Sequence, residues 1–140
     1  MKIKKALISV SDKSNLYSLL KVLKYFDIKL ISSGGTYKKI RNLGFKCDLI
    51  SEFTKTPEIL DGRVKTLHPK IHAGILNIRS KKSHVKQMKI NDYKNIDLVI
   101  VNFYPFEKTI KNNAYILIYF KLIDLPLSIA GWSKGFKLFK

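Results

Sequence analysis

Apolar residues near the start of the chain fall into short, uninterrupted runs. "KKALISV" (4–10) and "IKLISS" (28–33) are bounded by charged or turn-forming residues, so each predicts a buried strand followed by a turn. Between them, leucines recur at helical spacing, with Ser14 or Asn15 available as the helix cap. The first third of the chain therefore predicts a strand–helix–strand unit.

The same pattern continues along the chain. Residues 36–43 predict a short helix that ends at Gly44, and "FKCDLI" (45–50) predicts a third strand. A polar helix over 81–90 then precedes "NIDLVIVNF" (95–103), the fourth predicted strand. Strands that are apolar throughout and alternate with helices indicate a parallel sheet covered on both faces, so we expect a single doubly wound α/β domain.

Composition narrows the class of protein. A length of 140 residues fits one domain. The single cysteine, Cys47, excludes a disulfide framework and fits a reducing compartment, and we expect it to be a buried strand residue. The basic start lacks the apolar core of a signal peptide, and the most apolar run, 114–120, is far shorter than the roughly 20 residues of a membrane span. A cytoplasmic protein without a membrane segment is expected.

The net charge of +17 suggests a nucleic-acid partner, because clustered cations bind phosphate backbones. However, only three of the 27 basic residues are arginines, and the lysines are scattered instead of forming one stripe. Abundant Lys, Ile, Asn, Tyr and Phe also reflect the codon bias of an AT-rich genome. We therefore expect no specific nucleic-acid binding, but a favourable field for small phosphorylated anions.

In open parallel sheets, ligands bind outside the carboxyl ends of the strands. "SSGGT" follows the second predicted strand: Gly34 and Gly35 let the backbone approach an anion, while Ser32, Ser33 and Thr36 offer hydroxyls at a helix N-terminus. "SVSDKS" repeats this arrangement after the first strand with Ser9, Ser11 and Lys13. Either segment alone is equally compatible with an ordinary capped turn.

The segment "DGRVKTLHPKIHAGIL" (61–76) concentrates cationic donors between glycines and a proline. Arg63 can grip a phosphate or carboxylate with two bonds, and Lys65 can stabilise a developing oxyanion or donate a proton. Thr66 and His68 add hydrogen-bonding groups. Such a loop is typical of a rigid anion-binding element, with a solvated basic loop as the alternative.

Two further features complete the candidate chemistry. His68 and His72 have the spacing of a metal pair on a helix, but the intervening Pro69 argues against a helix interior, so we expect no metal site. "NFYPF" closes the fourth predicted strand and places Asn102 and Tyr104 toward the same crevice.

In this order and spacing, "SVSDKSNL", "SSGGTYKKIRNLGF", "DGRVKTLHPKIHAGIL" and "NFYPFEKT" resemble one family over residues 4–110. It is the amino-terminal, methylglyoxal-synthase-like domain of the bifunctional purine biosynthesis enzymes, which combine a formyltransferase with an inosine monophosphate (IMP) cyclohydrolase. The long third string is the most specific; "SGGT" also occurs in methylglyoxal synthase and in the allosteric domain of carbamoyl phosphate synthetase.

The resemblance implies a ring closure: the carboxamide nitrogen of a formylated ribotide attacks the formyl carbon, and water leaves to give IMP. It implies no metal and no organic cofactor, and a homodimer. Lys65 and Tyr104 would assist proton transfer and stabilise charge on the formyl oxygen. The residues implied to bind the purine ribonucleotide are Ser9, Ser11, Lys13, Ser33, Gly34, Gly35, Thr36, Arg63, Thr66 and Asn102.

Residues 111–140 depart from the family pattern and are interpreted as a divergent end of the same domain. Matching "ID" and "GWSKGF" to the family motifs gives Asp124 and Lys134 the roles of a further catalytic acid and lysine. The chain printed here holds no counterpart of the second domain, so we expect no transformylase activity. The apolar segment 114–120 is a candidate for aggregation or for burial in a dimer interface.

Three alternatives remain open from the sequence. The chain can be a nucleotide-binding remnant whose catalytic tail no longer forms, or, less in keeping with the scattered lysines, a basic nucleic-acid-binding module. A methylglyoxal synthase is disfavoured, because its chemistry needs a paired carboxylate base and only Asp12 and Asp61 lie near the predicted loops.

Overall fold

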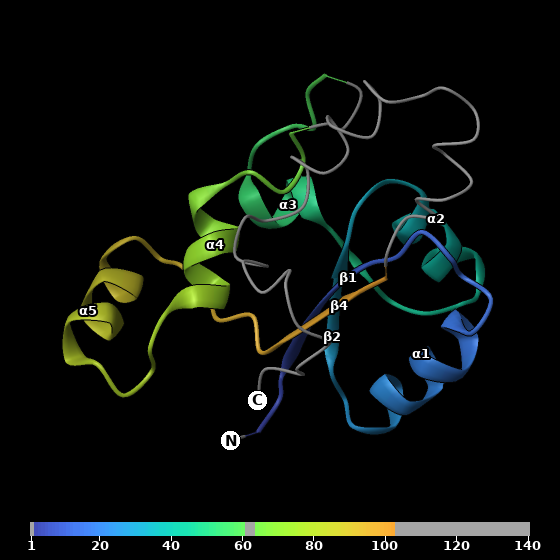
Figure 1. Ribbon diagram of the computed structural model, residues 1–140, viewed down its shortest axis with the longest axis horizontal. Coiled ribbons are helices and arrows are strands. Elements are labelled where there is room, and N and C mark those ends of the chain that lie inside the picture. Colours follow the sequence, from blue (N-terminus) through green and yellow to red (C-terminus); the bar gives the residue numbers. More distant parts are fainter. Residues whose placement is uncertain (1, 61–63, 103–140) are drawn as a thin grey trace, which may run out of the picture.

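The computed structural model describes residues 2–60 and 64–102, which form a four-stranded parallel sheet with helices on both faces (Figure 1). The strand order is β3-β2-β1-β4, and every pairing is parallel. The strands are β1 (Lys5–Ser9), β2 (Lys29–Ser32), β3 (Asp48–Leu49) and β4 (Leu98–Val101). The predicted doubly wound α/β architecture is confirmed.

Within the described residues, five helices connect these strands. One follows β1, one follows β2, and three lie between β3 and β4. They are α1 (Leu16–Tyr25), α2 (Gly34–Asn42), α3 (Ile50–Thr54), α4 (Pro69–Leu76) and α5 (Lys82–Ile90). None of the helices in these described ranges is both long and apolar enough to cross a membrane.

The two faces of the sheet hold two separate apolar cores. Side chains alternate along β1, so Ala6 and Ile8 point to one face and Leu7 to the other. The first face packs against α1 and α2, whose buried residues include Leu20 and Ile40. The second face packs against α3 and α4, and Figure 1 shows α5 further out beyond α4. Burial on both faces explains why the strands lack polar alternation.

The predicted elements need three corrections. Helix α2 begins at Gly34, two residues before the predicted start at Thr36, because both glycines belong to its first turn. The third strand is two residues long instead of six, since the chain enters α3 at Ile50, and Cys47, expected to be a buried strand residue, precedes this strand and is only partly buried. Neither α3 nor α4 was predicted, because each has only five to eight residues and too few apolar repeats to reveal a helical period.

The start of α1 also differs in detail from the prediction. Asn15 occupies the position before the helix, but its side chain makes no capping bond. Ser14 does not cap the helix either, because its hydroxyl donates to the Asp12 carboxylate at 3.1 Å. The side chains of this turn therefore stabilise the loop after β1 and leave the helix end to backbone contacts.

Candidate functional site

The loop after β1 carries the first group of predicted site residues. Ser9 ends the strand, and Ser11 and Lys13 follow it, all three partly exposed. The Lys13 ammonium group donates to the backbone carbonyl of Ser11 at 3.0 Å, so its charge lies over its own loop. This places a cation and two hydroxyls at the carboxyl end of the central strand β1.

Asp12 is the acidic member of this loop. Its carboxylate accepts hydrogen bonds from the Ser14 backbone amide at 2.9 Å and from the Ser14 hydroxyl. These bonds, and to a lesser extent the Lys13 charge, lower the pKa of the Asp12 carboxyl group. Asp12 is therefore ionised at neutral pH and is bound within its own turn.

The amino terminus of α2 forms the second group. Ser33 precedes the helix in an extended conformation, and Gly34 follows with φ of +51°, a backbone geometry that favours glycine. The amides of a helix's first turn have no partner within the helix and carry the positive end of its dipole. No acidic residue occupies the first turn of α2, so this terminus suits an anion.

Two predicted site residues bond to the backbone of the β1 loop. The Thr36 hydroxyl donates to the Val10 carbonyl at 3.0 Å, and Asn102, which directly follows β4, accepts from the Ser11 amide at 2.6 Å. The structure therefore brings the ends of β1, β2 and β4 together. The Ser32 hydroxyl was predicted to bind an anion. Ser32 is instead fully buried within the sheet, where its hydroxyl donates to the Ile8 carbonyl and does not face a ligand.

Lys65 and Thr66 precede α4 on the other face of the sheet. The far end of α4 lies beside the start of β4, since the Ile96 amide donates to the Gly74 carbonyl at 2.9 Å. Helix α4 thus runs opposite to the strands, as Figure 1 shows, and its beginning points toward their carboxyl ends. This orientation brings Lys65, which is partly buried, and Thr66, which is 7% exposed, toward the same edge as Ser9 and Ser11.

Four other predicted site residues, and the start of the basic loop, lie outside the described residues. Their roles remain predictions from the resemblance. They are Arg63, Tyr104, Asp124 and Lys134.

Of the two histidines of the basic loop, His68 directly precedes α4 and His72 lies in its first turn. Pro69 is the first residue of α4, so the segment starts a helix that was not predicted, and the two histidines do not share a helix interior; proline is well suited to a helix's first turn. His68 caps the helix, with its Nδ1 accepting from the Lys70 amide at 3.1 Å. Among residues 2–60 and 64–102, no group of three or more His, Cys, Asp or Glu is placed to hold a metal ion.

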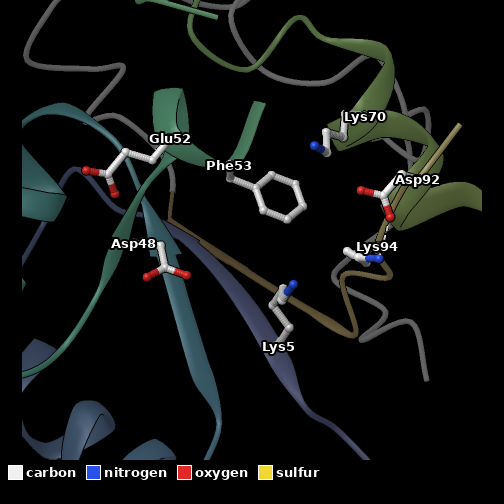
Figure 2. A pocket seen from close by; sticks show the side chains of 7 residues that line it. All are labelled: Lys5, Asp48, Glu52, Phe53, Lys70, Asp92 and Lys94. Atoms are coloured by element: carbon white, nitrogen blue, oxygen red, sulfur yellow. Dashed lines mark hydrogen bonds and ion pairs between the residues drawn. The ribbon is translucent and has the colours of Figure 1, made fainter. Parts of the chain in front are cut away.

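A separate hollow of about 350 Å³ lies on the face covered by α3 and α4 (Figure 2). The ammonium groups of Lys5 and Lys70 lie 4.9 and 5.5 Å from the centre of the Phe53 ring. Burial is the main cause that lowers the pKa of Lys5. None of the predicted site residues lines this hollow, whose lining is Lys5, Asp48, Glu52, Phe53, Lys70, Asp92 and Lys94.

Comparison with known proteins agrees with this geometry. The MGS-like domain family matches residues 15–127. This match extends beyond residue 110, after which the sequence departs from the motifs of the predicted family. The crystal structure of ForH superposes with a TM-score of 0.66 at 33% identity, covering 73% of this chain and 53% of that one. The chain therefore belongs to the MGS-like domain family.

Its curated relatives narrow the family further. The bifunctional purine biosynthesis protein PurH of Acetivibrio thermocellus is 46% identical over 138 residues, and that of Clostridium perfringens strain SM101 is 45% identical over 136. Each alignment covers 96% of this chain and 27% of the relative. PurH of Bradyrhizobium diazoefficiens is 49% identical over 113 residues. The chain thus spans about a quarter of the length of these PurH relatives, and the expected resemblance is confirmed.

Proposed function

We propose that this chain is an IMP cyclohydrolase domain, which closes the purine ring of a formylated aminoimidazole carboxamide ribotide. The observation that carries the proposal is the 45–49% identity to PurH proteins over most of the chain. The loops at the carboxyl ends of β1 and β2 support it, because Ser11, Lys13 and the amides of Gly34 and Gly35 suit a dianionic phosphate.

The reaction joins the carboxamide nitrogen to the formyl carbon. The formyl C=O bond becomes a C–O⁻ group that takes up a proton, and loss of this hydroxyl with the remaining N–H proton releases water and forms the ring C=N bond. Lys65 and Tyr104 would stabilise and protonate the formyl oxygen, while Asp124 and Lys134 would serve the proton transfers at the nitrogen. Groups already held in place stabilise such charge without reorganisation.

Ligand binding follows from the same proposal. Ser9, Ser33 and Thr36 lie with Ser11, Lys13 and the two glycines around the phosphate and ribose, and Arg63, Thr66 and Asn102 belong to the base side. We propose neither a metal nor an organic cofactor for the reaction, and no transformylase activity for the 140-residue chain.

The decisive experiment follows cyclisation of the formylated carboxamide ribotide by ultraviolet absorbance. The purified chain should turn over, and Lys65→Ala should reduce kcat by about 100-fold or more, the range for a lost proton-transfer group. Lys86→Ala, on the exposed side of α5, is the matched control and should retain full activity.

Two outcomes would contradict this assignment. A folded chain that binds IMP saturably but shows no turnover would instead be a nucleotide-binding remnant. A chain that binds duplex DNA with strong salt dependence, and does not bind IMP, would favour the nucleic-acid module.

A homodimer in the cytoplasm is the proposed state of the protein. Several apolar side chains are exposed around α4 and α5, including Leu76 at 58% and Ile90 at 70%, which a partner surface would cover. Sedimentation velocity at micromolar concentration should give the mass of two chains, and a single species of one chain would argue against the dimer.

A further inference from the structure

A second hollow, here called the amino-end hollow, lies where the central strands begin. Its volume is about 510 Å³, within the range of small-molecule sites. Two of its lining residues are paired across the sheet: Lys5 begins β1 and lies opposite Lys29, the first residue of β2. Strand β1 has five residues, so roughly 13 Å separates this hollow from the loop after Ser9, at the other end of the strand.

The lining of the amino-end hollow is basic. Five lysines and two aspartates contribute to it, whereas three lysines and three acidic residues balance in the hollow of Figure 2. The five are Lys2, Lys4, Lys5, Lys29 and Lys94. Among residues 2–60 and 64–102, Lys94 is the only one of them with an ion-pair partner, Asp92, and the Lys5 ammonium group lies over Phe53 in the other hollow. Three ammonium groups, those of Lys2, Lys4 and Lys29, therefore remain for an anionic ligand.

The two aspartates of the lining differ in their surroundings. Asp97 accepts from the backbone amides of Lys4 and Lys5 and pairs with Arg79, so its charge is compensated within the fold. Asp27 is exposed, with φ of +52°, and makes no ion pair within the part of the chain that the structure describes. An anion in the hollow would thus meet one uncompensated negative charge, that of Asp27.

An exposed aromatic pair forms one side of the amino-end hollow. Phe26 directly follows α1, lines the hollow and is 61% exposed. The Tyr25 ring meets the Phe26 ring edge-on, with the ring centres 5.1 Å apart and the planes at 86°. Planar rings stack on exposed aromatic side chains, so this side suits a ligand that joins a flat ring to an anionic group.

We propose that the amino-end hollow is a second nucleotide site, which binds a nucleoside polyphosphate with its phosphates among Lys2, Lys4 and Lys29 and its base on Phe26. Each lysine is a point charge that bonds phosphate oxygens, and three separate ammonium groups suit a chain of phosphates better than a single one. The site is independent of the proposed ring closure, since its lining shares no residue with the loops at the carboxyl ends of the strands.

Calorimetric titration of the 140-residue chain with ATP, without divalent metal ions, tests the site. Lys4→Gln combined with Lys29→Gln should weaken ATP binding about tenfold, because both remove exposed phosphate donors. Lys86→Gln, on the exposed side of α5, is the control and should bind as the wild type does. Phe26→Ala should weaken ATP binding about fivefold but leave inorganic triphosphate binding unchanged, because triphosphate has no ring to stack.

Asp27→Asn gives a result that a folding defect would not produce. Asparagine tolerates the same left-handed backbone, and loss of the negative charge should strengthen ATP binding about two- to threefold. ATP should also bind with unchanged affinity when IMP is saturating, and competition by IMP would overturn the proposal by assigning ATP to the loops at the carboxyl ends. Equal affinity of the wild type and the double lysine variant would overturn it too. A single-stranded 12-nucleotide oligo(dT) that binds through Lys4 and Lys29 where ATP does not would replace the small ligand by a nucleic-acid strand.

Discussion

The Asp97 carboxylate and the Arg79 guanidinium group lie 2.8 Å apart where β4 begins beside β1. The same carboxylate accepts from the backbone amides of Lys4 at 2.7 Å and Lys5 at 2.9 Å, and the Arg79 side chain also donates to the Ile96 carbonyl. The Asp97 side chain is only 7% exposed. One buried carboxylate thus joins the start of β1, the connection between α4 and α5, and the approach to β4.

Removing that carboxylate should destabilise the fold. Asp97→Ala leaves two backbone amides without their acceptor and removes the ion pair with the partly buried Arg79 guanidinium group, so we expect a loss of about 2–4 kcal/mol in the free energy of unfolding. Urea denaturation followed by circular dichroism measures it. Asp92→Ala is the control: the Asp92–Lys94 pair is exposed, so the midpoint should not move. Equal midpoints for the two variants would contradict this account.

Gly74 lies where α4 passes close to the chain entering β4. A Cβ atom at this position would come within 2.8 Å of the Lys94 carbonyl oxygen and 3.2 Å of the Ile96 side chain. Gly74→Ala should therefore cost about 1–3 kcal/mol of stability, although alanine favours helices. Gly35→Ala is the comparison, since nothing lies within 4 Å of a Cβ there, and it should leave the thermal midpoint unchanged or slightly raised.

The cap of α4 gives a third prediction. Because the His68 ring accepts from the Lys70 amide, His68→Ala should lower stability by about 0.5–2 kcal/mol, the usual cost of a lost N-cap. His68→Asn offers another acceptor and should recover most of the loss in the same urea titration. If the asparagine variant is no more stable than the alanine variant, the side chain of His68 contributes nothing as a cap.

Cys47 should react slowly in the folded protein. Burial, and then the charge of Asp48, raise the pKa of the Cys47 thiol from 9.0 to about 12. At about pH 8.5 iodoacetamide should therefore label the folded chain far more slowly than the urea-unfolded chain, because the thiolate is the reactive form. Labelling monitored by mass spectrometry checks this, and equal rates in both states would contradict it.

The same pKa shift makes stability depend on pH. Between about pH 9 and 12 the unfolded chain loses the thiol proton while the folded chain keeps it, so the free energy of unfolding falls as pH rises. At about pH 7 and below, well under both pKa values, the thiol is protonated in both states and this contribution is constant. Cys47→Ala should show a smaller alkaline decline in urea titrations than the wild type.

The strands of the central sheet were predictable because their signal is local. Apolar runs such as 4–10 and 28–33 contain β1 and β2, and alternation with helices indicated parallel pairing. The glycines of "SSGGT" marked the start of α2 for the same reason, since backbone freedom is a property of the residue itself. The amino end of α4 was missed because Pro69 signals either a break or a helix start, and only its neighbours decide which.

The amino-acid sequence by itself determined the fold class, the two apolar faces of the strands and the loop residues suited to an anionic ligand. Only the tertiary structure decided how those loops are held: Thr36 and Asn102 meet the backbone of Val10–Asp12 because parallel strands end at one edge of the sheet. It likewise decided that Ser32 is buried and that Asp97 joins three segments. Local pattern encodes burial and backbone freedom, but contacts between residues 26 to 93 positions apart depend on strand order and register.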